Sequence, residues 1–195
     1  MGRKTLVVAT RNEHKLRELG EVLTEFELEP LPDTVELPPE GGATFADNAL
    51  LKARAARAAT GRAAIADDSG IEARALGGAP GVRSARFAGP GASDEQNLEL
   101  LLRELEGAED RGVAYVCALA YVDDDGREHV LAGRCEGTLV AEPRGSGGFG
   151  YDPAFLPDDT GPDDPRTMAE LSAAEKHAIS HRGRAARALA EHLSR

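Results

Sequence analysis

Two adjacent carboxylates, Asp67 and Asp68, interrupt a short apolar run and are followed at once by Ser69 and Gly70. A pair of acids after a strand is often only part of a turn. Carboxylates at the end of a buried strand also hold hard cations such as Mg²⁺ beside phosphate groups. The pair is therefore a candidate site for metal binding or acid–base chemistry.

Lysine is rare in this chain, with four residues, at positions 4, 15, 52 and 176, among the 23 lysines and arginines. Lys15 follows Thr10 and Asn12 in a turn that leads into a predicted helix. Free backbone N–H groups and the helix dipole favour a phosphate at such a helix start. Taken alone, Asn12 is also typical of a simple helix cap, and Lys52 of a solvated helix face.

The glycine-rich segment GSGGFG at 145–150 satisfies the G-x-G-x-x-G pattern of dinucleotide sites. That pattern requires a helix that begins within the glycines, whereas Pro153 biases Asp152 toward extended backbone. The sequence therefore argues against a dinucleotide site. Two interpretations remain open: a plain turn, or a loop whose backbone approaches a flat ligand, with Phe149 or Tyr151 available to stack on it.

Composition places the chain among globular proteins, and its length suits one large domain or two intimate lobes; we expect one domain, residues 1–195. Of its 195 residues, 41% are hydrophobic and 29% charged, and the net charge is −11. This acidity argues against partners such as nucleic acid or an anionic membrane. No apolar stretch reaches the roughly 20 residues that span a bilayer, and the first residues lack a signal-peptide cleavage pattern. We expect a cytoplasmic protein whose two cysteines, Cys117 and Cys135, are reduced structural thiols.

The elements that must position these groups can be read from periodicity and caps. We expect a strand at 5–10, a helix at 12–26, a loop at 27–43, a helix at 44–59 and a strand at 63–66. An irregular segment at 75–93 then precedes a helix to 105, a hairpin of strands at 113–123 and 128–140, and helices opened by Thr167 and Ser180. This order predicts an α/β fold with a mixed sheet and helices on its faces.

Five segments, taken in order, resemble the inosine triphosphate pyrophosphatase family, the non-canonical purine NTP pyrophosphatases. They are ATRNEHKLREL (9–19), EGGATFADNALLKARAA (40–56), ADDSGIEARALGGAPGVRSARFAG (66–89), GFGYDPAF (148–155) and TMAELSAAEKHAISHRGRA (167–185). The match spans nearly the whole chain. The departures are Gly41 for a usual Thr, Asp47 for a usual Glu, and His177 for a usual Asn. None of them removes a group that the chemistry needs.

The resemblance implies an elongated, twisted mixed sheet in two lobes with a central active-site cleft, in a homodimer. It implies Mg²⁺-dependent hydrolysis of ITP, dITP and XTP to the nucleoside monophosphate and pyrophosphate, which keeps these nucleotides out of DNA and RNA.

Residue roles also follow from the resemblance. Glu40 and Asp68 match the Mg²⁺ ligands, and Asp68 also the catalytic acid or base. The residues that match substrate contacts are Thr10, Arg11, Asn12, Glu13, His14 and Lys15 in the triphosphate turn, Lys52, Ser69, then Phe149, Gly150, Tyr151 and Asp152 at the nucleoside, and Lys176, His181 and Arg182 at the base.

Side-chain alternation along a strand predicts that Asp67 points away from Asp68 and supports the turn or the site from behind. Two alternatives stay open: a Maf-like pyrophosphatase, whose motifs fit the later segments poorly, and a nucleotide-binding module without catalysis. Intact Glu40, Asp68 and Lys15 argue against the second.

Overall fold

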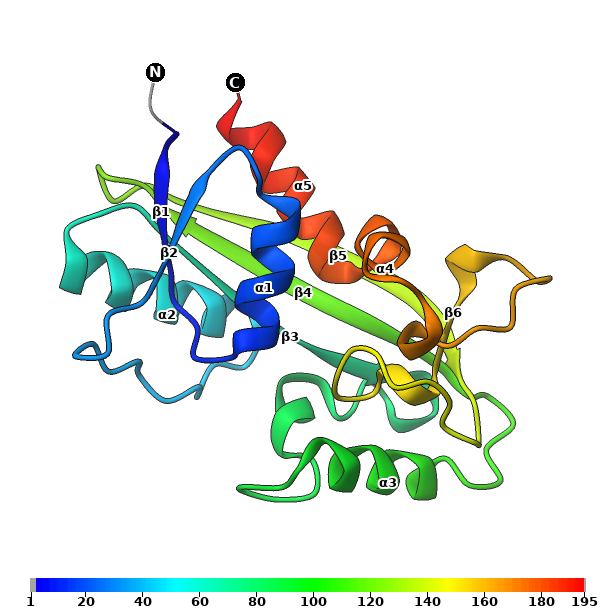
Figure 1. Ribbon diagram of the computed structural model, residues 1–195. Helices are drawn as coiled ribbons and strands as arrows, with labels where there is room; N and C mark the ends of the chain where they lie inside the picture. The colour runs from blue at the N-terminus through cyan, green and yellow to red at the C-terminus, as the bar shows by residue number, and fades with distance from the viewer. Residues whose placement is uncertain (1–2, 195) are drawn as a thin grey trace. The chain divides into compact units, whose positions relative to one another are not determined.

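The structure is a computed structural model that describes residues 3–194, and its strands form one mixed sheet (Figure 1). The strands are β1 (Thr5–Val8), β2 (Glu27–Pro30), β3 (Ala64–Ala73), β4 (Gly112–Val122), β5 (Glu128–Leu139) and β6 (Phe155–Pro157). Their order in the sheet is β2-β1-β3-β4-β5-β6. Strand β1 pairs in parallel with both β2 and β3, whereas β5 and β6 pair antiparallel. The expected α/β class with a mixed sheet is confirmed.

The described residues form five α-helices, and all but the fourth begin after a cap residue that the sequence predicts. They are α1 (Glu13–Val22), α2 (Phe45–Thr60), α3 (Asp94–Glu104), α4 (Ala173–Ile179) and α5 (His181–Leu193). Asn12 caps α1, and capping boxes open α2 at Thr44 and α3 at Ser93. In the box of α2, Asp47 fills the role of the glutamate usual in the family, because its carboxylate accepts the Thr44 amide at 3.2 Å. The departure at position 47 therefore leaves the cap intact.

Four expectations were wrong in detail. The start of the segment 27–43 is not loop but the edge strand β2, whose Glu- and Pro-rich sequence carries no alternation signal and which is held by pairing with β1. Strand β3 does not end at the aspartates but continues to Ala73. The short strand β6 was not expected. Thr167 opens only a 3-10 turn at Met168–Glu170, and the helix starts after the Ser172 cap.

The chain divides into two compact units. Unit 1 comprises residues 1–68, 117–133 and 182–195, and contains both ends of the chain; unit 2 comprises residues 69–116 and 134–181. One boundary falls inside β3, between Asp68 and Ser69, and another lies between His181 and Arg182; the remaining two fall inside β4 and β5. The candidate site residues are therefore shared between two units that are described separately below.

Unit 1 buries a core that joins the sheet to helices α1 and α5. Its members are Leu6, Val8, Leu19, Leu23, Ala63, Ile65, Cys117, Leu119, Tyr121, Ala185, Ala186 and Leu189. Leu19 and Leu23, from the apolar positions that predicted the helix α1, are at most 1% exposed. This packing fixes the face of α1 on which Lys15 and Glu18 lie, one turn apart.

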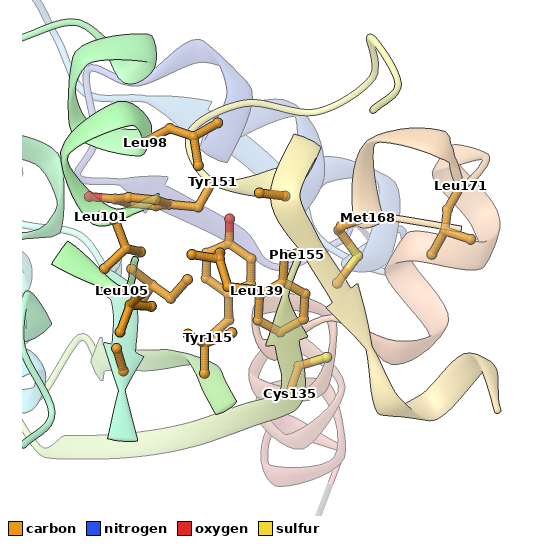
Figure 2. Close-up of a cluster of buried hydrophobic side chains, with 14 residues drawn as sticks. Leu98, Leu101, Leu105, Tyr115, Cys135, Leu139, Tyr151, Phe155, Met168 and Leu171 are labelled. Carbon is orange, nitrogen blue, oxygen red and sulfur yellow. The ribbon is translucent and has the colours of Figure 1, made fainter. Parts of the chain in front are cut away.

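Unit 2 has its own core, shown in Figure 2. Leu98 and Leu101 of α3, with Leu105 directly after it, pack there against Tyr115, Leu139, Tyr151, Phe155 and Met168. The rings of Tyr115 and Phe155 lie 4.5 Å apart between centroids.

Both cysteines are buried and form no disulfide, as expected. Within residues 3–194, no helix is both long and apolar enough to span a membrane.

Candidate active site

Asp67 lies at the centre of a buried charge network in unit 1. Its Oδ2 accepts from Lys15 Nζ at 3.1 Å and from Arg182 Nη2 at 3.0 Å. The other arm of the Arg182 guanidinium donates to Glu18. Burial alone would disfavour the charge on Asp67, but Lys15, Arg182 and Lys52 outweigh burial and hold its pKa well below the usual range. Asp67 is therefore a permanent anion that fixes two cations.

Asp68 faces a different set of residues. Asn48 Nδ2 donates to its Oδ2 at 2.9 Å, and Lys52 Nζ lies 3.7 Å from its Oδ1. The same ammonium group contacts Glu40 Oε1 at 2.6 Å. The two neighbouring aspartates thus have separate partners, as the alternation of side chains along β3 predicts. Glu40 and Asp68 converge on one cation.

The environment of Asp68 suits a proton acceptor. Its pKa is raised, first because burial disfavours the charged form and then because Glu40 lies near, while Lys52 and Asn48 oppose the increase. A raised pKa makes a carboxylate a stronger base toward a positioned water. The pKa of Lys52 is also raised, since the pull of Asp67, Asp68 and Glu40 exceeds the effect of burial. Lys52 therefore stays charged beside these acids.

The residues present fit a hard divalent cation. Glu40 and Asp68 already share the positive charge of Lys52, so their oxygens point toward one cation position. Among residues 3–194, no three His, Cys, Asp or Glu side chains are grouped as a complete metal site. Mg²⁺ usually takes only one or two carboxylates and completes its shell with water and substrate phosphates. Two converging carboxylates meet that requirement.

Charge balance points the same way. Unit 1 gathers four carboxylates, of Glu18, Glu40, Asp67 and Asp68, around the three cations Lys15, Lys52 and Arg182. This cluster carries more negative than positive charge. It would repel a bare triphosphate but attract a divalent cation, which neutralises both the cluster and the phosphates.

The turn at residues 10–15 is folded around Asn12. The Asn12 Oδ1 accepts from the backbone amides of His14 and Lys15, at 2.9 and 3.2 Å, and Thr10 Oγ1 accepts from the Asn12 amide at 3.1 Å. Asn12 is thus a helix cap in this structure. The cap fixes the start of α1, and the Lys15 side chain extends from the first turn of that helix to Asp67.

The remaining residues of this turn lie at the surface. Arg11 donates to the carbonyls of Leu31, Pro32 and Val35, so its guanidinium holds the loop after β2. The His14 ring contacts Arg17 Nη2 at 2.7 Å, and Glu13 is exposed. The substrate contacts expected for these residues stay predictions.

Unit 2 gathers the second set of expected residues around Asp152. Its Oδ1 accepts from Tyr115 Oη at 3.0 Å, and its Oδ2 accepts from Lys176 Nζ at 2.7 Å and from the Phe149 amide at 2.9 Å. The Lys176 ammonium also lies 5.2 Å from the centroid of the Phe149 ring. One buried carboxylate therefore holds a lysine and an aromatic ring together.

Two glycines of the loop 145–150 lie where a side chain would clash with neighbouring atoms. Gly148 has a φ of +71°, and a Cβ there would lie 2.0 Å from the Asp152 carboxylate. A Cβ on Gly145 would meet the Ala169 backbone at 2.6 Å. After the glycines comes a 3-10 turn at Asp152–Ala154, not an α-helix. Asp152 lies within that turn, so the expectation that Pro153 keeps it extended was wrong.

Two further residues of unit 2 are fixed by packing. The His181 ring stacks on Tyr115, with centroids 4.6 Å apart and planes at 10°. Tyr151 donates to the Ser84 carbonyl at 2.7 Å.

Gly70, which follows the half-buried Ser69, has no room for a side chain because a Cβ would lie 2.3 Å from Ser84 Oγ.

Arg182 lies in unit 1, with its guanidinium between Asp67 and Glu18 and only 2% of the residue exposed. The sequence grouped it with Lys176 and His181 at the base. In the structure the Arg182 guanidinium binds two buried carboxylates of the protein. Its contact with the base stays a prediction.

Sequence reasoning missed three polar residues: Glu18, Asn48 and Tyr115. Asn48 lies four residues before Lys52 and hence on the same face of α2, and Glu18 lies three residues after Lys15 on α1. Those spacings were available as signals. Tyr115 had no such signal, because it lies in an apolar strand, and its contact with Asp152 joins residues 37 positions apart.

The chain is similar to known proteins over nearly its whole length. A profile of the Ham1 family matches residues 6–192. A protein of Frankia alni named dITP/XTP pyrophosphatase is 52% identical over 196 residues, which cover 95% of each chain. The structure of a HAM1 protein from Coxiella burnetii is similar at a TM-score of 0.86 and 40% identity, over 98% of each chain.

A crystal structure from Mycobacterium abscessus, titled nucleoside-triphosphatase and dITP/XTP pyrophosphatase, is similar at a TM-score of 0.74 and 47% identity, over 95% of this chain and 98% of that one. The resemblance carried by the five sequence segments is thereby confirmed. The chain belongs to the Ham1 family.

Proposed function

We propose that this protein is a Mg²⁺-dependent pyrophosphatase that hydrolyses ITP, dITP and XTP to the monophosphate and pyrophosphate. Such an activity removes these nucleotides from the pool before they enter DNA or RNA. The relatives named dITP/XTP pyrophosphatase support the substrates. The observation that carries the chemistry is the convergence of Glu40 and Asp68 on the Lys52 ammonium group, with Asp68 buried and held by Asn48.

Asp68 is the proposed general base. Water attacks the α-phosphorus, Asp68 accepts the proton of that water, and the bond to pyrophosphate breaks as the leaving group takes the electron pair. Asn48 fixes the carboxylate through Oδ2 and leaves Oδ1 on the side of Lys52. An oriented carboxylate of this kind typically accelerates such a step by about 10²- to 10⁴-fold.

Lys15 and Lys52 are the proposed phosphate contacts. Asp67 holds Lys15 in place, and Glu40 does the same for Lys52. Glu40 and Asp68 would hold Mg²⁺, which neutralises the charge that develops on the leaving pyrophosphate. These assignments place the triphosphate on residues of unit 1.

Residues of unit 2 are proposed to select the base. Phe149 offers a ring for stacking, and Lys176, held by Asp152, offers a donor above that ring. Hypoxanthine and xanthine present an acceptor oxygen at position 6, whereas adenine presents an amino group. A donor that faces the wrong group gives discrimination of up to about 10⁴- to 10⁵-fold.

A panel of nucleoside triphosphates with Mg²⁺ tests the proposal, with pyrophosphate and phosphate assayed separately. We expect equimolar pyrophosphate and monophosphate from ITP, dITP and XTP, and far slower turnover of ATP. Release of phosphate without pyrophosphate would reject the cleavage position. Preference for ATP would reject the substrate class.

The resemblance also supports a homodimer that acts in the cytoplasm, where nucleotide pools are held. Light scattering coupled to size exclusion is expected to give twice the mass of the 20.6 kDa chain. Elution at the mass of one chain would contradict the dimer.

A further inference from the structure

We call Phe149, Asp152, Lys176 and His181 of unit 2 the base cluster. Tyr115 contacts two of these residues, Asp152 and His181. It lies on β4 in unit 2, is 7% exposed, and its hydroxyl donates to Asp152 Oδ1 at 3.0 Å. Its ring stacks on His181, nearly parallel, at 4.6 Å between centroids. Figure 2 shows the same ring beside Phe155 within the core. The side chain is thus fixed by packing and can in turn fix its polar neighbours.

The hydroxyl completes the set of donors around Asp152. Lys176 and the Phe149 amide both donate to Oδ2, while Tyr115 donates to Oδ1. A carboxylate with donors on both oxygens cannot rotate about its χ2 without breaking one of these bonds. Because Lys176 depends on Asp152 for its position, Tyr115 acts on the lysine through the acid.

We propose that Tyr115 is a positioning residue for base selection, which holds Asp152 with its hydroxyl and His181 with its ring. This inference rests on the proposed function of the chain. Tyr115 touches the acid and the imidazole, not the base itself, so its loss should weaken recognition of the base and leave the chemical step unchanged.

Tyr115→Phe removes the hydroxyl and keeps the ring stack on His181. Loss of a hydrogen bond to a charged group corresponds to an increase of about 10-fold in KM for ITP, with kcat changed by less than about 2-fold. Selectivity for ITP over ATP should fall by the same factor of about 10. Tyr115→Leu removes the stack as well and should lower selectivity further.

Tyr121→Phe is the matched control. Tyr121 is also buried on β4 but belongs to unit 1, where its hydroxyl accepts from Lys4 Nζ at 2.6 Å and its ring lies beside those of His129 and His192. We expect its KM and selectivity to equal those of the wild type. Thermal melts of both variants show whether any difference in KM accompanies a difference in stability.

A second pair of variants tests the route through Asp152. If Tyr115 acts through this acid, then Tyr115→Phe should have no further effect on KM in an Asp152→Ala background, where the acceptor of its hydroxyl is absent. The double variant removes both polar partners, which is better tolerated than leaving one of them unmatched. Additive effects in this cycle would overturn the route.

The outcomes separate the two claims. A wild type that releases no pyrophosphate from ITP or XTP rejects the proposed function. An active wild type with Tyr115→Phe unchanged in KM and selectivity rejects the positioning role alone. A uniform loss of kcat for all nucleotides, with KM unchanged, also rejects it, because the effect would then lie on the chemical step.

Discussion

The two units hold their buried carboxylates in different ways. In unit 1, Asp67 is bound by two cations, and Asp68 shares a third with Glu40. In unit 2, Asp152 is bound by one ammonium, one hydroxyl and one backbone amide. The first set keeps an excess of negative charge, whereas the second pairs one acid with one lysine.

This difference matches the two ends of the proposed substrate. A cluster with surplus carboxylates favours a divalent cation and, through it, a triphosphate. A balanced cluster with an aromatic ring suits an uncharged base, which is read by hydrogen bonds and stacking. We infer that unit 1 sets the rate of the chemical step and unit 2 sets the choice of nucleotide. The predictions below test that division.

Removal of the metal should have the largest effect. With excess EDTA, we expect hydrolysis of ITP to stop and to return when Mg²⁺ is added in excess, because Lys52 alone does not balance the two carboxylates of Glu40 and Asp68 that then face the triphosphate. Binding of IMP, followed by calorimetry, should persist under EDTA, since the base cluster needs no metal. Full turnover in EDTA would refute the metal requirement.

Asp68→Asn should come next. Its loss as a base and as a metal ligand should lower kcat for ITP by at least about 10²-fold. The amide keeps the size of the side chain, so the melting temperature should remain close to that of the wild type. Kinetics at saturating Mg²⁺ measure the effect, and a kcat near the wild-type value would move the catalytic role away from Asp68.

Asn48→Ala should reduce turnover by about 10- to 100-fold, the range typical of residues that orient a ligating carboxylate. Asn48 donates to Asp68 and accepts from the Gly42 amide at 2.8 Å, so the variant loosens Asp68 and the loop after Glu40 together. Its control is Asn97→Ala, a buried asparagine of α3 that accepts from the Ala88 amide and donates to the Ala85 carbonyl in unit 2. We expect both variants to lose stability but only Asn48→Ala to lose kcat to this extent.

Asp67→Asn should affect stability more than turnover. It leaves Lys15 and Arg182 without their shared anion, and removal of one partner of a buried pair costs about 3 to 5 kcal/mol. At roughly 2 to 4 °C for each kcal/mol in a chain of this size, the melting temperature should fall by at least about 6 °C. The expected decrease in kcat at saturating Mg²⁺ is below about 10-fold.

The effect of Asp67 on stability should depend on pH. Its folded-state pKa is lowered, so its contribution is complete above the unfolded value of about 3.9 and is lost as pH falls below that value. The difference in melting temperature between wild type and Asp67→Asn should therefore narrow as pH is lowered from about 5 to about 2. A difference that does not change with pH would contradict the charge network.

The fold was predictable where local signals act. Caps at Asn12, Thr44 and Ser93 located three helices because the cap side chain binds amides only a few residues away. Strand β2 could not be predicted, since its Glu- and Pro-rich sequence becomes a strand only through pairing with β1. Local propensity is weak at such an edge, and the tertiary context decides.

The candidate site was predictable as residue types but not as contacts. The adjacent aspartates and the rare lysines could be recognised in the sequence, and strand alternation separated Asp67 from Asp68. The position of Arg182 beside Glu18 depends on how α5 packs on α1, and no local spacing encodes that contact across 164 residues. The same holds for Tyr115 and Asp152.

The ratio of kcat/KM for ITP to that for ATP, compared between Asp68→Asn and Asp152→Asn, tests the division of roles most directly. We expect Asp68→Asn to lower both values and to leave the ratio within about 3-fold of the wild type, because the chemical step is common to both nucleotides. Asp152→Asn should lower the ratio by about 10-fold, because Lys176 loses its charged partner. A ratio that falls in Asp68→Asn and stays unchanged in Asp152→Asn would contradict the account.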